Sequence, residues 1–195
     1  MNLRCRNIKI NVMLAHPLDL GLIHSKELTI ANKRTCFTLR YVYLDCVITI
    51  YKHSPTSLHI TGIKSSSMIT EVFEFLSNVL NTTVISSKID NSMFCGKLNQ
   101  LVNISCIIQE IKRNCSSYNC NYCEEIFPAL FIKPTKEKRR EGVPTILLFP
   151  NGSIIIMGAK NVAGVKHAQR FLIHCLIQSK LSSVHQSRRL VLCYK

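Results

Sequence analysis

The chain has 195 residues, 47% of them apolar, and its 25 Lys and Arg outnumber 11 Asp and Glu, giving a formal net charge of +14. This charge favours polyanionic partners, nucleic acid first and an anionic membrane surface second. No window approaches the ~18 consecutive apolar residues of a membrane span, and the N-terminus lacks the apolar core and cleavage site of a secretory signal. We therefore expect an intracellular protein whose ten cysteines are mostly reduced core residues.

The first half of the chain predicts a strand-rich unit that ends in a helix. His16–Leu20 is expected to lead into a short helical segment, and Lys52–Ser57 to form a turn containing Pro55. Ser65–Ser67 offers N-cap residues for the closing helix. The predicted strands are Asn7–Leu14, Phe37–Tyr43, Cys46–Tyr51 and Leu58–Thr61. The apolar residues at helical spacing are Ile69, Val72, Phe73, Leu76, Val79 and Leu80.

The second half predicts the same order of elements. A strand is expected at Asn103–Ile108, a Cys-rich loop at Ser116–Glu125, a strand at Phe127–Ile132 and a charged insertion at Lys133–Gly142. A helix follows Lys160, with one apolar stripe made of Val165, Ala168, Leu172, Cys175 and Leu176.

Between the charged insertion and this helix lies a hairpin that is apolar on both faces. Thr145–Phe149 and Ser153–Met157 flank the turn Pro150-Asn151-Gly152. Successive side chains of a strand point to opposite faces, so a solvated hairpin should alternate apolar and polar residues. The helix after Lys160 can cover one face. The other face needs a second cover, which a partner molecule could supply.

The offsets between matching positions predict a duplicated half-domain. Asn7 to Asn103 and Gly62 to Gly158 are both 96 positions apart. The predicted fold is α+β, with two pseudo-symmetric repeats, residues 1–90 and 96–195, forming one curved antiparallel sheet with two long helices on its convex face. The boundary is expected within Asn81–Lys97, which is polar and poorly periodic.

Several segments, taken in order, resemble the TATA-box-binding protein family over nearly the whole chain. In the second half they are Ser116–Tyr118, Glu124–Leu130, Ile146–Phe149 and Gly158–Lys160; in the first half they are Asn7-Ile8, Leu18–Leu20, Phe37 and Thr61–Lys64. The resemblance implies a saddle whose concave sheet lies on the A·T-rich minor groove, with phenylalanines wedged between base steps. The first half has drifted further, as in a viral or protist relative.

The resemblance also implies roles for single residues. Phe127 and Phe149 correspond to the second-half wedge pair, Phe37 and Tyr51 to the first-half pair, and Asn7 and Asn103 to the central asparagines. The full set expected to contact DNA is Asn7, Lys9, Phe37, Tyr51, Thr61, Asn103, Phe127, Lys133, Arg139, Arg140, Leu147, Phe149 and Met157. Glu124 and Glu125 correspond to acidic residues that contact transcription factor IIB.

The chain departs from the family pattern in two ways. Met157 stands where the family has a threonine, and Lys9, Thr49 and His59 occupy positions that are apolar in the family. The insertion, with Lys136, Lys138, Arg139 and Arg140, is expected to lengthen the second-half stirrup loop and to add charges that reach phosphates.

The sequence gives little support for a metal site or for catalysis. Cys115, Cys120 and Cys123 have the spacing of three ligands of an iron–sulfur or zinc site, but no second Cys-x2-Cys pair follows, so reduced loop cysteines are the better prediction. No catalytic histidine arrangement, nucleophile elbow or phosphate loop is present. We expect neither an enzyme nor a cofactor.

The sequence therefore predicts a DNA-binding initiation factor of the nucleus, or of a viral transcription site, that recruits a factor IIB-like partner and RNA polymerase machinery. Two alternatives stay open. One is a saddle-fold scaffold whose concave face binds a protein; the other is an accessory domain of a nucleic-acid enzyme. No membrane or small-molecule partner is expected.

Overall fold

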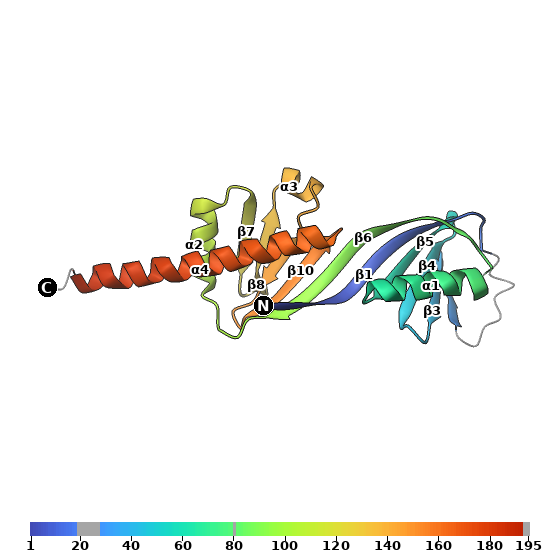
Figure 1. Ribbon diagram of the computed structural model, residues 1–195, viewed down its shortest axis with the longest axis horizontal. Coiled ribbons are helices and arrows are strands. Elements are labelled where there is room, and N and C mark those ends of the chain that lie inside the picture. The colour runs from blue at the N-terminus through green and yellow to red at the C-terminus, as the bar shows by residue number, and fades with distance from the viewer. Residues whose placement is uncertain (19–27, 80, 193–195) are drawn as a thin grey trace. The chain divides into compact units, whose positions relative to one another are not determined.

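The computed structural model describes residues 1–18, 28–79 and 81–192, without the side chains of 79 and 182–192. The chain divides into two compact units (Figure 1). Unit 1 comprises Met1–Arg4 and Phe94–Lys195, and unit 2 comprises Cys5–Met93. No helix within the described ranges has both the length and the apolar character needed to cross a bilayer.

Over its described residues, unit 2 is an antiparallel sheet with one helix. Its strand order is β2-β3-β4-β5-β1-β6, and β1 and β6 each contribute residues to both units. The elements are β1 (Asn2–Leu14), β2 (Leu28–Asn32), β3 (Cys36–Tyr41), β4 (Cys46–Tyr51), β5 (Ser54–Ile63), α1 (Ser66–Val79) and β6 (Val84–Lys97).

One face of this sheet packs on α1 because every second strand residue is apolar and points toward the helix. Ile48 and Leu58 are fully buried, as are Val72 and Leu76 of α1. The ring of Tyr41 stacks on Phe75 of α1 with centroids 4.0 Å apart. The four strands predicted in this half and its long helix are confirmed as β1, β3, β4, β5 and α1, whereas the sequence does not predict β2. The short helix predicted from His16 falls mostly outside the described residues.

Unit 1 has a second antiparallel sheet segment with three helices. Its strand order is β6-β10-β9-β8-β7. The remaining elements are α2 (Ile104–Asn114), β7 (Tyr118–Cys123), β8 (Phe127–Pro134), α3 (Lys136–Arg140), β9 (Thr145–Leu148), β10 (Ser153–Ala159) and α4 (Val162–Leu192).

The predicted hairpin and the helix that follows it are confirmed as β9, β10 and α4. Gly152 closes the hairpin at φ +81°, and a Cβ there would lie 2.5 Å from the backbone oxygen of Gln100, so only glycine fits. The Asn161 side chain accepts the N–H of Gly164 at 2.8 Å and caps α4. The predicted stripe of α4 is buried against the sheet, together with Ile107 and Ile111 of α2.

The strand predicted at Asn103–Ile108 is wrong, because this segment begins α2. Asn103 is the N-cap, and its Oδ1 accepts the N–H of Cys106 at 3.2 Å. Ile104, Ile107 and Ile111 are buried at spacings of three and four residues, which is a helical period. A short apolar run of this kind fits either a strand or a buried helix, and the cap decides between them.

Two further segments differ from the prediction. Most of the predicted loop at Ser116–Glu125 is strand β7, which pairs with β8. The turn at Lys52–Ser57 is shorter than predicted because β5 begins at Ser54. Within Asn81–Lys97, where the boundary between the repeats is expected, Val84–Lys97 forms strand β6. Each of these strands is rich in polar residues, so its hydrogen-bonded partner strand, rather than apolar periodicity, holds it in the sheet.

The cap on α2 yields a stability prediction. Removing the oxygen that satisfies the Cys106 N–H in an Asn103→Ala variant should lower the free energy of unfolding by about 1 kcal/mol. Urea denaturation of the full chain measures it. Asn119→Ala, at an exposed position of β7, is the control and should change the unfolding free energy by less than ~0.5 kcal/mol. Equal unfolding free energies for the two variants would contradict the cap.

Candidate nucleic-acid interface

Strand register divides the side chains of β8, β9 and β10 between two faces. Leu130, Leu148 and Ile154 stand side by side in one row, and Ile132, Ile146 and Ile156 in the next. All six are at most 1% exposed, and they belong to the core that α2 and α4 complete. The alternate residues therefore point to the opposite face.

This opposite face, which we call the open face of unit 1, is also apolar. It is made of Phe127, Phe131, Leu147, Phe149, Ile155 and Met157. Phe131, Leu147 and Ile155 lie side by side across β8, β9 and β10. Leu147, flanked by these two neighbours, is 4% exposed, whereas Phe127 is 38% exposed. The face is thus a partly exposed apolar surface, as the hairpin sequence predicts.

Three aromatic rings of the open face lie together. Phe127 begins β8 and Phe149 directly follows β9, which brings them to the same end of these antiparallel strands. The ring of Phe127 lies 5.9 Å from that of Phe149, edge to face, and 5.3 Å from that of Phe131. Phe131 is absent from the predicted contacts, although its spacing of four residues from Phe127 places both on one face of a strand.

Basic groups lie toward the other end of β8. Lys133 shares the open face, with its ammonium 5.3 Å from the centre of the Phe131 ring. Arg139 and Arg140 are exposed on α3, which joins β8 to β9. Since β8 spans roughly 23 Å at 3.3 Å per residue, α3 lies far from Phe127. The prediction that the insertion lengthens the stirrup loop is therefore wrong.

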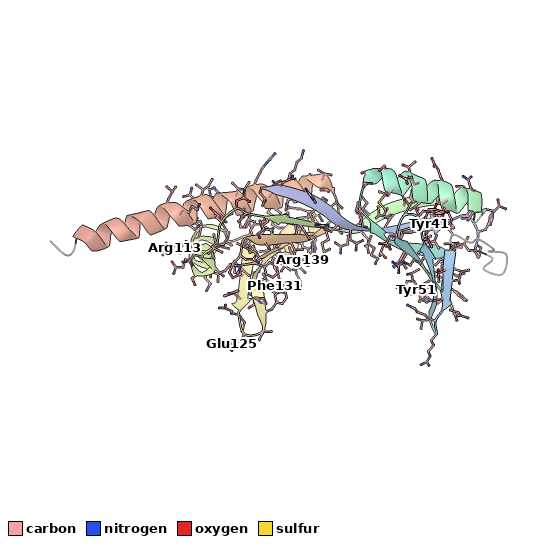
Figure 2. All side chains as sticks on the ribbon, turned by 90° about the horizontal axis from the view of Figure 1, so that it is seen from below. Tyr41, Tyr51, Arg113, Glu125, Phe131 and Arg139 are labelled. Carbon is pink, nitrogen blue, oxygen red and sulfur yellow. The ribbon has the colours of Figure 1, made fainter. Side chains whose placement is uncertain are left out.

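The acidic pair lies in the turn between β7 and β8. Glu124 and Glu125 are exposed there, beside Ile126, which is 84% exposed. Figure 2 shows Glu125 at the tip of this hairpin, with Phe131 farther back along it. A hydrogen bond from the Ile126 N–H to the Cys123 carbonyl, 3.1 Å long, closes the turn. Acidic and apolar groups thus share one exposed tip.

The corresponding face of unit 2, the face away from α1, is polar. Lys9 of β1 pairs with Asp90 at 2.9 Å. Burial, and then the positive charge of Lys9, lower the pKa of His59, while Asp90 acts in the opposite direction. Asn7 Oδ1 accepts the N–H of Gly62 at 2.8 Å, which leaves its NH₂ group as a donor. Thr61 lies opposite Val47.

The first-half aromatic pair is not brought together. Phe37 lies opposite Ile50, which is 2% exposed, whereas Tyr51 lies opposite Cys36. Phe37 therefore shares the face of Leu39 and Tyr41, toward α1, while Tyr51 points to the other face. The resemblance pairs these two rings by their order in the sequence, but the β3–β4 register puts them on opposite faces. Asn103, as the N-cap of α2, likewise lies outside the sheet.

The cysteines of unit 1 differ in how far they are buried. Cys115 and Cys175 are hydrogen-bonded, and burial raises the pKa of Cys175 to about 12 and that of Cys120 to about 11. Cys123 is exposed at the end of β7. Within the described ranges, no three His, Cys, Asp or Glu residues gather into a group that could hold a metal ion. All nine cysteines described are free thiols, and Cys46 and Cys175 are buried.

Comparison with known proteins agrees with this architecture. Residues 86–179, from β6 to α4, match the sequence profile described as "Transcription factor TFIID (or TATA-binding protein, TBP)". The structure of Methanococcus jannaschii TBP is similar with a TM-score of 0.71 and 17% identity, covering 91% of this chain and 99% of that one.

Two other comparisons add nothing to the assignment. A structure of A. aeolicus tRNASec in complex with M. kandleri SerRS has a TM-score of 0.35 and 11% identity, covering 98% of this chain and 32% of that one, which is too little likeness for an inference. No curated protein sequence matches this chain. The profile match over residues 86–179 and the shared fold together support a protein of the TATA-binding protein family, whose members are DNA-binding transcription factors.

Proposed function

We propose that this protein is an initiation factor that binds and bends A·T-rich duplex DNA through the open faces of its sheet and recruits a factor IIB-like partner and RNA polymerase machinery. It acts in the nucleus or at a viral transcription site. The observation that carries this proposal is the open face of unit 1, an apolar surface with three clustered phenylalanine rings at one end.

The wedge role is proposed for Phe127 and Phe149. A ring at the end of a strand, partly exposed and supported by a second ring, is placed to enter a base step. Minor-groove proteins of this kind insert apolar side chains between base pairs and gain contact area from the resulting bend. Leu147 and Met157 provide the apolar surface of the open face between the two wedge phenylalanines and the middle of the sheet. Lys133, Arg139 and Arg140 supply phosphate contacts, which raise affinity without reading sequence.

We further propose that the chain contains two related repeats, residues 1–90 and 96–195, with α1 and α4 on one side of the sheet. Each repeat then has a strand that leads to a glycine at positive φ, Gly62 at +93° and Gly158 at +87°, and then to its long helix. The change from one compact unit to the other at Met93 and Phe94, within β6, lies between the two proposed repeats and supports this division.

The two repeats contribute unequally. Unit 2 offers Asn7, Thr61 and Tyr51 as polar contacts, with Asn7 able to donate to the acceptors on adenine and thymine. Lys9 and Asp90 form an ion pair on the face of unit 2 that points away from α1. Covering an ion pair with DNA costs more desolvation free energy than covering an apolar side chain. Unit 2 therefore binds DNA more weakly than unit 1.

A Phe127→Ala/Phe149→Ala double variant tests the wedges. It should weaken binding to an A·T-rich duplex about 25-fold, because a loss of roughly 1 kcal/mol at each ring multiplies Kd by about five per ring. Titration of a labelled duplex at two salt concentrations measures Kd. Phe37→Ala removes a ring from the α1 side of unit 2 and should leave Kd unchanged. Equal effects of the two variants, or no effect of the double variant, would contradict the wedge role.

An Asp90→Asn variant tests whether unit 2 contributes to DNA binding. The variant removes a carboxylate that repels the DNA phosphates, and it releases Lys9 from its ion pair. Duplex binding should therefore tighten several-fold, and the salt dependence of Kd should correspond to the release of about one more counterion. The matched control is Asp45→Asn, since Asp45 also pairs with a basic residue, Arg40 at 2.6 Å, but lies in the β3–β4 turn. If both variants tighten binding equally, net charge alone is responsible and the role of unit 2 in binding fails.

The partner is tested at the β7–β8 turn. A Glu124→Ala/Glu125→Ala variant should bind duplex normally but capture a factor IIB-like protein on the preformed complex about fivefold more weakly or worse, the factor for a loss of ~1 kcal/mol. A gel-shift titration of the partner measures capture. Glu71→Ala/Glu74→Ala, on the exposed side of α1, removes the same charge elsewhere. Partner capture that is the same in both variants rules out the turn as the contact.

A protein-interaction scaffold without sequence-specific DNA binding is the second candidate. The observation that favours it is the Lys9–Asp90 ion pair on the face of unit 2 that points away from α1, since a carboxylate is unfavourable next to phosphates. This candidate, like an accessory domain of a nucleic-acid enzyme, predicts that the protein lacks a preference for A·T-rich over G·C-rich duplexes.

A further inference from the structure

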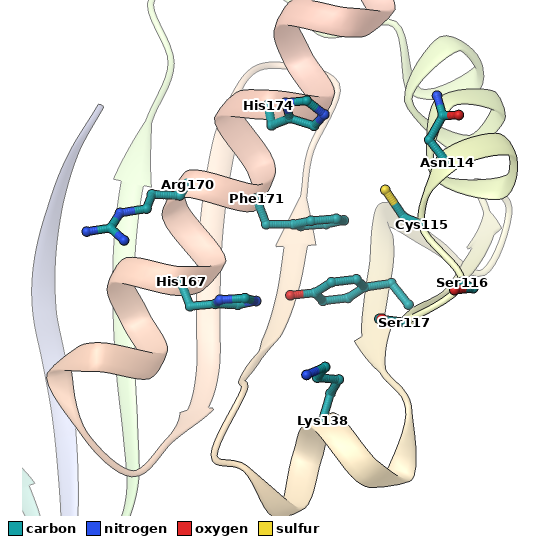
Figure 3. A pocket seen from close by; sticks show the side chains of 10 residues that line it. Asn114, Cys115, Ser116, Ser117, Lys138, His167, Arg170, Phe171 and His174 are labelled. Carbon is teal, nitrogen blue, oxygen red and sulfur yellow. The ribbon is translucent and has the colours of Figure 1, made fainter.

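Unit 1 contains a pocket that the proposed DNA interface does not use. Its volume is about 430 Å³, within the range of small-ligand sites. Figure 3 shows that His167, Arg170, Phe171 and His174 reach it from α4, Lys138 from α3, and Asn114 to Ser117 from the end of α2 and the segment after it. These elements bring residues that are far apart in sequence around one cavity on the helix side of the sheet.

Tyr118, which lines the pocket, has a buried hydroxyl without a hydrogen-bond partner. Tyr118 is 8% exposed, and its ring stacks on Phe171 with centroids 3.8 Å apart. Its oxygen is buried and makes no hydrogen bond. Leaving such a group unpaired is unfavourable, and burial raises the pKa of this hydroxyl to about 12. Tyr118 therefore stays protonated and presents a hydrogen-bond donor to the pocket.

The other polar groups that reach the pocket are mostly donors as well. Lys138 and Arg170 are cationic at neutral pH, and His167 adds a ring N–H, although Arg170 points away from the other side chains in Figure 3. The hydroxyls of Ser116 and Ser117 can donate at the pocket's edge. No carboxylate lines the pocket among the described residues.

Two acidic side chains are bonded to residues that line the pocket. Glu141 accepts from Lys138 Nζ at 2.8 Å, which leaves two of the three ammonium donors of Lys138 available. Glu110 is 4% exposed and accepts from Asn114 Nδ2 at 2.7 Å. A set of convergent donors with a net positive charge fits a ligand that only accepts hydrogen bonds and carries negative charge.

We propose that this pocket binds a phosphate monoester group, with Lys138, His167 and the Tyr118 hydroxyl as its donors. A phosphate offers three or four acceptor oxygens and up to two negative charges, which matches several donors around one cavity better than a carboxylate does. The source is either a free phosphate compound or a phosphorylated side chain of a protein partner. The site is separate from the open face and does not depend on the proposed DNA binding.

The test uses the full chain without DNA and measures binding by calorimetry with three probes. These are inorganic phosphate, a phosphoserine peptide and acetate as the carboxylate control. Tighter binding of inorganic phosphate indicates a free phosphate ligand, and tighter binding of the peptide indicates a phosphorylated partner; either supports the site. Absence of phosphate and phosphopeptide binding, or binding of acetate as tight as that of phosphate, overturns it.

Three variants locate the binding. Lys138→Ala and His167→Ala should each weaken phosphate binding about tenfold, as expected for the loss of a charge-assisted hydrogen bond. Lys166→Ala, an exposed lysine next to His167 and outside the pocket, removes the same charge as Lys138→Ala and should leave binding unchanged. Equal losses in Lys166→Ala and Lys138→Ala would show attraction by net charge alone and overturn the site.

Tyr118→Phe separates binding from folding. The variant deletes only the unpartnered oxygen, so without ligand it should unfold at the same temperature as the wild type or higher. With phosphate present its gain in unfolding temperature should be smaller than that of the wild type, because one donor is missing. An equal gain in both proteins would exclude Tyr118 from the site and overturn the proposed donor set.

Discussion

The structure depends on the two-residue alternation of side chains in β8, β9 and β10. Ile132, Ile146 and Ile156 stand in one row and are buried by α2 and α4. The same strands point Phe131, Leu147 and Ile155 the other way, and no polar residue interrupts that row. Two apolar faces on one sheet require two covers, of which the helices provide one. The open face, and hence the proposed DNA binding, follows from this constraint.

Much of this arrangement could be predicted from the sequence because strong local signals agree with one another. The turn at Asn151-Gly152, the apolar hairpin around it and the stripe on α4 each specify the same packing. The ordered match to the TATA-binding protein family then placed Phe127 and Phe149 on one face, and their rings do lie together. Phe131, on the same face, could have been identified from its spacing alone.

The failures have physical causes of two kinds. The short apolar run after Asn103 favours a strand, but the Asn103 side chain caps α2, and such a run fits a buried helix equally well. Phe37 and Tyr51 lie on opposite faces because Phe37 is paired with Ile50 and Tyr51 with Cys36, and strand register cannot be read from sequence order alone. Similarly, β7 and β6 are polar strands that neighbouring strands hold in place, and such tertiary pairing leaves little trace in local sequence.

The central claim is that the open face reads the minor groove, and base substitution in the DNA tests it most directly. Inosine·cytosine pairs present the A·T pattern of acceptors in the minor groove and the G·C pattern in the major groove, because inosine lacks the guanine amino group. Affinities should be compared for A·T, I·C and G·C versions of one duplex at fixed salt. We expect the I·C duplex to bind like the A·T duplex and the G·C duplex to bind more weakly. An I·C duplex that binds like the G·C duplex would contradict minor-groove recognition.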